Sequence, residues 1–283
     1  MVKAVVCDLD GSLLNHRHVL SKRSIQMIHT LAEQGIEFMI ATGRDFESAM
    51  VLFERVKVPF RKILLNGAMV CDTQNTIISM KAIPNEEVRK IAEIFESYKI
   101  AWNIYTPKGA ASFCTKEELL ESFKDAASLL NFVSEEDMQE FSHYFDGLQY
   151  YSSCEKMLEE EKEILKIECN DSRLDILQEI KEKLKQFTDL DIVSSFSLNI
   201  EITSKKATKG NALADILMKF GIAEDEVLVF GDSENDLSML NYPNAYAMAN
   251  ADAMIKQKAT CILPYTNAED GIAKFVEEVV LRK

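Results

Sequence analysis

The chain has 283 residues, of which 47% are hydrophobic and 28% are charged, a composition typical of globular domains. Its formal net charge of −14 argues against a nucleic-acid or anionic-membrane surface, because phosphate groups attract clustered Lys and Arg. No stretch approaches the ~18 continuous apolar residues of a membrane span, and the apolar run at the N-terminus is too short for a signal peptide. We therefore expect a cytoplasmic protein with no nucleic-acid or membrane partner and with six reduced cysteines.

Residues 1–80 alternate between short apolar strands and amphipathic helices. One predicted helix begins after Ser21, which can act as the N-cap, and ends at Gly35. The strands predicted in this part span 2–9, 36–41 and 62–65, and the helices span 21–35 and 45–56.

Residues 204–283 repeat this alternation. The predicted strands span 226–232, 244–248 and 260–264, and the predicted helices span 209–221, 234–240 and 270–281. Strands that alternate with helices indicate βαβ units. The expected fold is therefore an α/β core with a doubly wound, Rossmann-like parallel sheet.

The middle of the chain has a different pattern. Helices are predicted at 86–98 and 174–187, and the strand signals come in neighbouring pairs at 100–105 with 110–114 and at 190–195 with 197–202. Paired strands indicate antiparallel hairpins and an α+β module. We therefore expect residues 84–203 to form an inserted α+β domain within a core made of residues 1–83 and 204–283.

An acidic motif, Asp8-Leu9-Asp10-Gly11, follows the first predicted strand. Two carboxylates at the end of an apolar strand are costly to bury unless a cation compensates them. Gly11 allows the chain to turn away at once. An EF-hand calcium loop is excluded, because Ser12 and Leu13 follow where that loop requires glycine. Taken alone, the motif fits either a metal site or an ordinary acidic turn.

Two further signals suit a phosphate group. Thr42, after the second predicted strand, offers a hydroxyl and a backbone N–H at a helix N-terminus, although plain N-capping explains it better by itself. Lys209 starts a predicted helix, where the positive end of the helix dipole disfavours a cation. A bound anion would remove that conflict, and an exposed lysine is the alternative.

A second acidic segment, 231–236, follows the strand 226–232. Helix capping explains Asp232 or Ser233, but it does not readily explain Asp236, which lies one turn further on. In open parallel sheets, ligands bind at the carboxyl edge of the strands. If the strand ends carrying Asp8, Thr42 and Asp232 meet, they form a magnesium site beside a phosphate site.

These motifs together resemble the haloacid dehalogenase superfamily of aspartate-nucleophile phosphatases. The first motif of the superfamily matches Asp8 and Asp10, the second Thr42, the third Lys209, and the fourth Asp232 with Asp236. The insertion looks like the large α/β cap of the Cof-like branch, which hydrolyses sugar phosphates and other small phosphoesters. Segments 66–68 and 267–271 also resemble that branch. Ser12, where Thr is usual, and Ala249, where Gly is usual, depart from its pattern.

The resemblance implies a Mg²⁺-dependent phosphatase acting on a small phosphorylated metabolite. Asp8 would attack phosphorus to form an aspartyl phosphate, and Asp10 would serve as general acid and base. Mg²⁺ would be held by Asp8, the backbone carbonyl of Asp10, and Asp232. Thr42 and Lys209 would bind the transferred phosphoryl group.

The remaining candidates surround this centre. Asn235 and Asp236 are expected to support the outer shell of the metal and to fix Lys209. The cap is expected to read the leaving group, with Trp102, Asn103 and Tyr105 as either readers or packing residues. Candidate substrate-binding residues are Gly43, Arg44, Asn66, Gly67 and Asn267, of which Arg44 is equally well explained as an exposed helix arginine.

Two other functions fit the same core. A phosphomutase would use the same residues and return the phosphoryl group to a sugar. A non-catalytic, phosphate-ligand-binding regulatory module would normally lack Asp8 or Asp10, and both are present. The sequence carries no signal for an oligomeric state.

Overall fold

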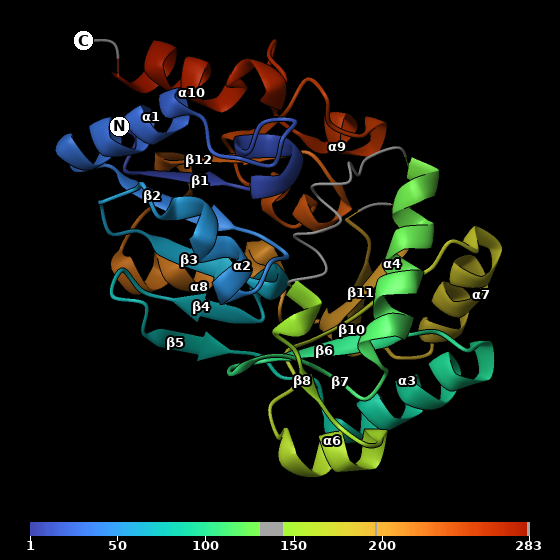
Figure 1. Cartoon of the computed structure of the whole chain (residues 1–283). Coiled ribbons are helices and arrows are strands. Elements are labelled where there is room, and N and C mark those ends of the chain that lie inside the picture. The colour runs from blue at the N-terminus through green and yellow to red at the C-terminus, as the bar shows by residue number, and fades with distance from the viewer. Residues whose placement is uncertain (131–143, 196, 282–283) are drawn as a thin grey trace. The chain divides into compact units, whose positions relative to one another are not determined.

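The computed structural model describes residues 1–130, 144–195 and 197–281 (Figure 1). The chain divides into two compact units: a core unit of Met1–Met80 with Ala207–Lys283, and an inserted unit of Lys81–Lys206. The segment 84–203, which was expected to form the insertion, falls inside the inserted unit. Within it, residues 131–143 and 196 lie outside the described part of the chain.

The core unit is built on an eight-stranded sheet with the order β14-β13-β12-β1-β2-β3-β4-β5. Neighbouring strands from β14 to β3 run parallel, and β4 and β5 add an antiparallel edge. The central strand β1 is fully buried, as a valine-rich strand covered on both faces should be. The strands are β1 (Ala4–Cys7), β2 (Glu37–Ala41), β3 (Arg61–Leu64), β4 (Met69–Cys71), β5 (Ile77–Met80), β12 (Val227–Gly231), β13 (Ala245–Ala247) and β14 (Cys261–Ile262).

Helices cover this sheet. α1 begins after Ser21, whose hydroxyl accepts a hydrogen bond from the Ser24 N–H, and Gly35 follows it with φ +71°. In Figure 1, α1 lies beside α10, and α8 packs on β3. The helices are α1 (Lys22–Glu33), α2 (Phe46–Met50), α8 (Lys209–Phe220), α9 (Ala253–Lys258) and α10 (Gly271–Val276).

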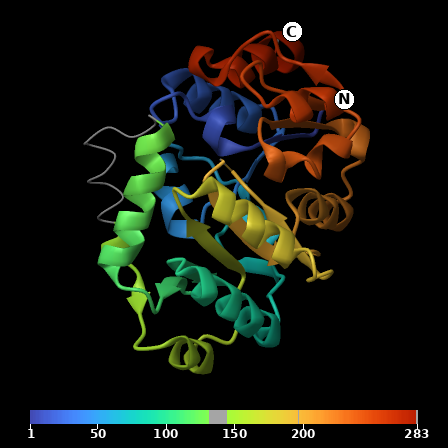
Figure 2. The ribbon, with the colours of Figure 1, turned by 90° about the vertical axis from the view of Figure 1, so that its right-hand side faces the viewer.

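The inserted unit has a six-stranded sheet with the order β10-β11-β9-β6-β7-β8. The two predicted hairpins are β6–β7 and β10–β11, and β9 pairs antiparallel with both β6 and β11. The helices α3 and α7 lie side by side (Figure 2). The elements are α3 (Asn85–Tyr98), β6 (Trp102–Thr106), β7 (Gly109–Ser112), α4 (Lys116–Leu130), β8 (Gln149–Tyr150), α6 (Cys154–Glu160), β9 (Lys166–Asn170), α7 (Leu174–Leu184), β10 (Leu190–Val193) and β11 (Asn199–Ser204).

The predicted fold class, a doubly wound α/β core with an inserted α+β domain, is confirmed. One predicted helix is wrong: 234–240 forms two short 3₁₀ turns, Glu234–Asp236 and Met239–Asn241. The predicted helix 45–56 is shorter than expected, because α2 gives way to a 3₁₀ turn at Val51–Phe53. Among the described residues, no helix combines the length and the apolar character needed to cross a membrane.

Trp102 belongs to the core of the inserted unit rather than to a surface. Its ring is 1% exposed and packs edge-on against Phe95 and Phe113, with ring centroids 5.8 and 5.3 Å apart. Its neighbours Asn103 and Tyr105 point to the other face of the sheet, because side chains alternate along a strand. The packing interpretation therefore holds for Trp102.

Candidate active site

Three of the predicted motifs meet at one edge of the core sheet. β12, β1 and β2 are neighbouring parallel strands, and the residue that follows each of them is Asp232, Asp8 and Thr42, respectively. The carboxyl ends of parallel strands share an edge, so adjacent strands bring residues far apart in the sequence together.

Lys209 is the centre of the buried charges at this edge. Its side chain is fully buried, and Nζ donates to Asp8 Oδ1 at 2.7 Å and to Asp236 Oδ1 at 2.8 Å. Burial lowers the pKa of Lys209, but the attraction of Asp236 and Asp8 outweighs it and raises the pKa above its ordinary value. These two carboxylates compensate the unfavourable position of the Lys209 ammonium group at the positive end of the α8 dipole.

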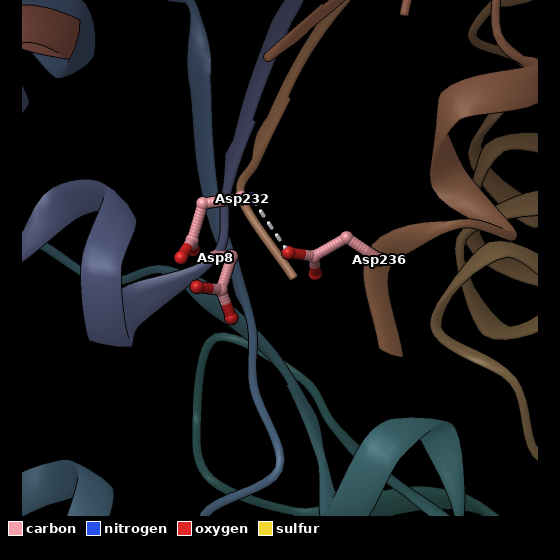
Figure 3. Close-up of side chains that lie close together, drawn as sticks. All are labelled: Asp8, Asp232 and Asp236. Carbon is pink, nitrogen blue, oxygen red and sulfur yellow. Dashed lines mark hydrogen bonds between the residues drawn. The ribbon is translucent and has the colours of Figure 1, made fainter. Parts of the chain in front are cut away.

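Asp236 has both carboxylate oxygens engaged. Oδ1 accepts from Lys209. Oδ2 accepts from the backbone N–H of Asp232 at 2.9 Å, the bond drawn in Figure 3, and from that of Ser233 at 3.2 Å. Asp236 therefore fixes both Lys209 and the turn that carries Asp232.

Asp8 and Asp232 are the carboxylates of this cluster that can still accept a further ligand. Asp8 Oδ2 is buried and has no hydrogen-bond partner, whereas Asp232 Oδ1 accepts from Ser12 Oγ at 2.9 Å. One oxygen from each of Asp8, Asp232 and Asp236 lies within 4.8 Å of the others. A Cβ at Gly11 would come within 2.1 Å of Asp232 Oδ2, so this close approach requires glycine.

The electrostatics of this cluster call for a further cation. Burial, then repulsion from Asp236, raises the pKa of Asp8 well above its usual range despite the opposing influence of Lys209. Burial and Asp236 likewise raise the pKa of Asp232 to about 7. Three carboxylates beside one ammonium group leave two negative charges uncompensated when all are ionised. Carboxylate oxygens are the hard donors that Mg²⁺ prefers, and one of them, Asp8 Oδ2, has no hydrogen-bond partner. The cluster therefore fits Mg²⁺.

Asp10 has a different environment from Asp8. Its carboxylate receives two hydrogen bonds from Arg44, Nε to Oδ2 and Nη2 to Oδ1, each at 2.7 Å, and His18 Nδ1 lies 3.0 Å from Oδ1. Burial raises the pKa of Asp10, but hydrogen bonds and positive charge from Arg44 and His18 outweigh it and hold the pKa well below its usual range. Arg44 therefore contacts Asp10, an acidic residue of the first motif. This contact accounts for its position. It supports neither an exposed helix arginine nor a direct contact with the substrate.

Thr42 presents its hydroxyl at the sheet edge but not its backbone N–H. The N–H donates to the Ile63 carbonyl at 2.9 Å, and Oγ1 accepts from the Arg44 N–H at 3.1 Å. The expectation that Thr42 lies at a helix N-terminus is wrong, because α2 begins at Phe46 and Asp45 is its N-cap. Gly43 is half-buried in the bend between these two elements.

Asn66 and Gly67 join the end of β3 to other parts of the site. Asn66 Oδ1 accepts from Asn235 Nδ2 at 3.1 Å, and the Asn66 N–H donates to the Thr42 carbonyl at 3.0 Å. Gly67 has φ +98°, and a Cβ there would lie 2.4 Å from the Thr208 carbonyl oxygen. This segment thus fixes the start of α8, from which Lys209 projects.

Asn267 supports the loop after β1. Its Nδ2 donates to the Leu14 carbonyl at 2.9 Å, and its N–H donates to Asn250 Oδ1 at 3.0 Å. Asn250 in turn donates through Nδ2 to the Gly11 carbonyl at 2.8 Å. Sequence reasoning missed Asn250 and His18 as neighbours of the site, because each reaches it through a single side-chain contact that has no signature in the local sequence.

Comparisons with known proteins agree with this geometry. A family model described as haloacid dehalogenase-like hydrolase matches residues 5–276. A Bacillus subtilis protein named 5-amino-6-(5-phospho-D-ribitylamino)uracil phosphatase is 29% identical over 99% of this chain and 98% of its own length. A second Bacillus subtilis protein, named a phosphatase, is 28% identical over 99% of this chain and 100% of its own length.

Solved structures show the same similarity. The structure of a haloacid dehalogenase-like hydrolase from B. subtilis matches with a TM-score of 0.87 and 26% identity, over 99% of this chain and 100% of that one. The family model and the structural match both extend over nearly the whole chain, including the segments that carry all four motifs. This protein therefore belongs to the haloacid dehalogenase-like hydrolase family.

Proposed function

We propose that this protein is a Mg²⁺-dependent phosphatase that hydrolyses a small phosphorylated metabolite, a sugar phosphate or similar phosphoester, through an aspartyl phosphate on Asp8. The observation that carries the proposal is the state of Asp8: Lys209 holds Oδ1, while Oδ2 is buried without a partner beside Asp232. A structural carboxylate would have both oxygens satisfied, as Asp236 has.

In the first step, an oxygen of Asp8 bonds to phosphorus while the bond from phosphorus to the leaving oxygen breaks. Asp10 gives a proton to that leaving oxygen. Because Arg44 and His18 favour the ionised form of Asp10, this step requires those contacts to loosen when the substrate binds, so that Asp10 holds a proton. In the second step, water attacks the phosphorus of the aspartyl phosphate, Asp10 takes its proton, and the bond between phosphorus and Asp8 breaks. Inorganic phosphate and free Asp8 result.

Charge compensation is the main requirement of both steps, because an anionic carboxylate approaches an anionic phosphate. Lys209 supplies one positive charge, held in place by Asp236. Asp8, the backbone carbonyl of Asp10, and Asp232 would hold Mg²⁺, which neutralises charge on the phosphoryl oxygens when bound. The Thr42 hydroxyl can donate to the transferred phosphoryl group.

The test is release of phosphate from p-nitrophenyl phosphate and from a panel of phosphorylated metabolites, with Mg²⁺ and with EDTA. Two relatives from Bacillus subtilis are named 5-amino-6-(5-phospho-D-ribitylamino)uracil phosphatase, so that compound is the first candidate substrate. Metal-dependent release supports the proposal. Transfer of the phosphoryl group between sugars without net release would indicate a phosphomutase, and binding without turnover a regulatory module.

Replacing Asp232 with Asn should raise the Mg²⁺ concentration needed for half-maximal activity at least about tenfold, because a neutral amide is a much weaker ligand for a hard cation. The amide has nearly the same shape as the carboxylate, so it fits in the close contact between residue 232 and Gly11. The measurement is a Mg²⁺ titration of activity. Asp252→Asn is the matched control, since Asp252 is exposed and its side chain makes no capping hydrogen bond. Lost activity with an unchanged Mg²⁺ requirement would assign Asp232 another role.

A further inference from the structure

Three consecutive residues after β3 have left-handed backbone conformations. Leu65, Asn66 and Gly67 have φ values of +51°, +56° and +98°. Glycine adopts this conformation freely and asparagine tolerates it, but a bulky residue such as leucine rarely does. Leu65 is also fully buried. The turn 65–67 is therefore strained, and strain of this kind persists only where the surrounding contacts hold it.

The backbone of this turn is bonded to the loop after β2. The Leu65 N–H donates to the Arg44 carbonyl at 3.0 Å, and the Asn66 N–H donates to the Thr42 carbonyl at 3.0 Å. We call residues 42–44 the Thr42 loop. Two successive N–H groups of the strained turn thus fix the loop that carries the Thr42 hydroxyl.

The side chain of Asn66 contacts a different loop, residues 232–236 after β12, which we call the Asp232 loop. Asn66 is 2% exposed, and its Oδ1 accepts from Asn235 Nδ2 at 3.1 Å. Asn235 Oδ1 in turn accepts from Ser233 Oγ at 2.8 Å. Ser233 follows Asp232 directly. A chain of side-chain hydrogen bonds therefore leads from the turn after β3 to the candidate metal ligand Asp232.

Pairing between neighbouring strands does not by itself connect these two loops. The order of the strands is β12-β1-β2-β3, so β3 is three positions from β12. Neighbouring strands lie about 4.8 Å apart, which places β3 and β12 about 14 Å apart in the sheet. Asp8 and Thr42 follow the two strands between them. The contact of Asn66 with Asn235 therefore bridges the edge of the sheet at which the candidate site lies.

We propose that Asn66 is a positioning residue that acts through Asn235 to hold the Asp232 loop, so that Asp232 stays beside Asp8 for Mg²⁺ binding. This inference rests on the proposed function. Asn66, a candidate substrate-binding residue by its sequence, then contacts neither the substrate nor the metal. The left-handed turn makes this role possible, because its N–H groups bind the Thr42 loop while the Asn66 side chain binds the Asp232 loop.

Asn66→Gly removes the side chain and keeps the turn, because glycine adopts φ +56° without strain. Loss of a group that supports the ligands of a metal weakens metal binding about 10–100-fold. We expect the Mg²⁺ dissociation constant, measured by calorimetry without substrate, to rise at least about tenfold. An unchanged dissociation constant would overturn the inference.

Asn75→Gly is the matched control. Asn75 also has a left-handed backbone, with φ +66°, and lies between β4 and β5 of the same unit. Its Oδ1 accepts from Lys62 Nζ and not from a residue of the candidate site. Asn75→Gly should leave the Mg²⁺ dissociation constant unchanged. An equal loss of Mg²⁺ affinity in both variants would indicate a general loosening of the core unit and contradict the role of Asn66.

A double-mutant cycle tests the route through Asn235. Asn235→Ala should weaken Mg²⁺ binding at least as much as Asn66→Gly does, because it removes the same hydrogen bond from the other side. The double variant should bind Mg²⁺ no more weakly than Asn235→Ala alone, since residues that act as one unit do not have additive effects. Additive losses would overturn the inference.

Steady-state kinetics separate positioning from contact with the substrate. At saturating Mg²⁺, Asn66→Gly should leave KM for p-nitrophenyl phosphate and for the best metabolite unchanged, because no contact with the substrate is lost. A higher KM for both substrates at saturating Mg²⁺, with an unchanged Mg²⁺ dissociation constant, would assign Asn66 to substrate binding instead.

Failure of the proposed function would be distinguishable from failure of this inference. Calorimetric binding of Mg²⁺ needs no turnover, so it tests Asn66 even if no phosphoester is hydrolysed. If the wild-type protein binds no Mg²⁺, the proposed function is wrong and the inference falls with it. If the wild-type protein binds Mg²⁺ and Asn66→Gly binds it equally well, only the inference is wrong.

Discussion

Asp8→Asn should lower phosphoester hydrolysis by at least about 10³-fold and leave the protein folded, because removal of a catalytic nucleophile costs a large part of the rate enhancement. The amide has nearly the shape of the carboxylate, and its oxygen can still accept the hydrogen bond from Lys209. What is lost is the anionic oxygen that forms the bond to phosphorus. The measurement is kcat at saturating Mg²⁺ with p-nitrophenyl phosphate and with the best metabolite found.

The melting temperature provides an independent readout for Asp8→Asn. Burial and the neighbouring carboxylates raise the pKa of Asp8, so its ionised form is disfavoured in the metal-free protein. A neutral residue at this position should therefore keep or raise the melting temperature at pH 8 in EDTA. Asp252→Asn, at an exposed site, should change neither activity nor melting temperature. If Asp8→Asn retains a tenth of the wild-type kcat, covalent catalysis through Asp8 is wrong.

Asp10→Asn should lower kcat about 10²–10⁴-fold for alkyl phosphates, which is the usual loss when a general acid–base is removed. The loss should be much smaller for p-nitrophenyl phosphate in the first step, because a good leaving group needs little protonation. The measurement is kcat/KM for a series of phosphoesters with leaving groups of increasing basicity. Equal losses across the series would count against the acid role.

Arg44→Ala is the informative companion to Asp10→Asn. The guanidinium holds both oxygens of Asp10, so a role through Asp10 predicts that the loss follows leaving-group basicity and that the double variant is no worse than Asp10→Asn alone. If Arg44 binds the substrate directly, KM should instead rise for every phosphoester, and the two losses should combine.

The sequence by itself determined the elements that depend on local patterns. Val5 and Val6 lie in a short apolar run that becomes the buried central strand, and Ser21 caps a helix because its hydroxyl satisfies a free N–H of the first turn. The alternation of strands and helices was sufficient to predict the parallel sheet. Since parallel strands share a carboxyl edge, the positions of Asp8 and Asp232 after their strands placed both residues at that edge, and they meet there because β1 and β12 are neighbours in the sheet.

Elements with weak local signals were not predicted. The antiparallel strands β4 and β5 of the core sheet and the strand β9 of the inserted unit were missed, because short strands are specified largely by the neighbours with which they pair. The segment 234–240 has the composition of a helix, but it forms only two 3₁₀ turns. Asp236 accepts from the N–H groups of Asp232 and Ser233, which precede the first turn, and this contact has no periodic signature in the sequence.

Only the tertiary structure decided how the individual side chains of the site are used. Arg44 turned out to hold Asp10, and Asn267 to hold the loop at Leu14, because these partners are distant in sequence and meet only when the strands are in register. For the same reason, the Thr42 N–H donates to the Ile63 carbonyl of the neighbouring strand. Local sequence fixes which groups follow each strand. Which of them stay unpaired, as Asp8 Oδ2 does, depends on long-range distances that only the folded chain sets.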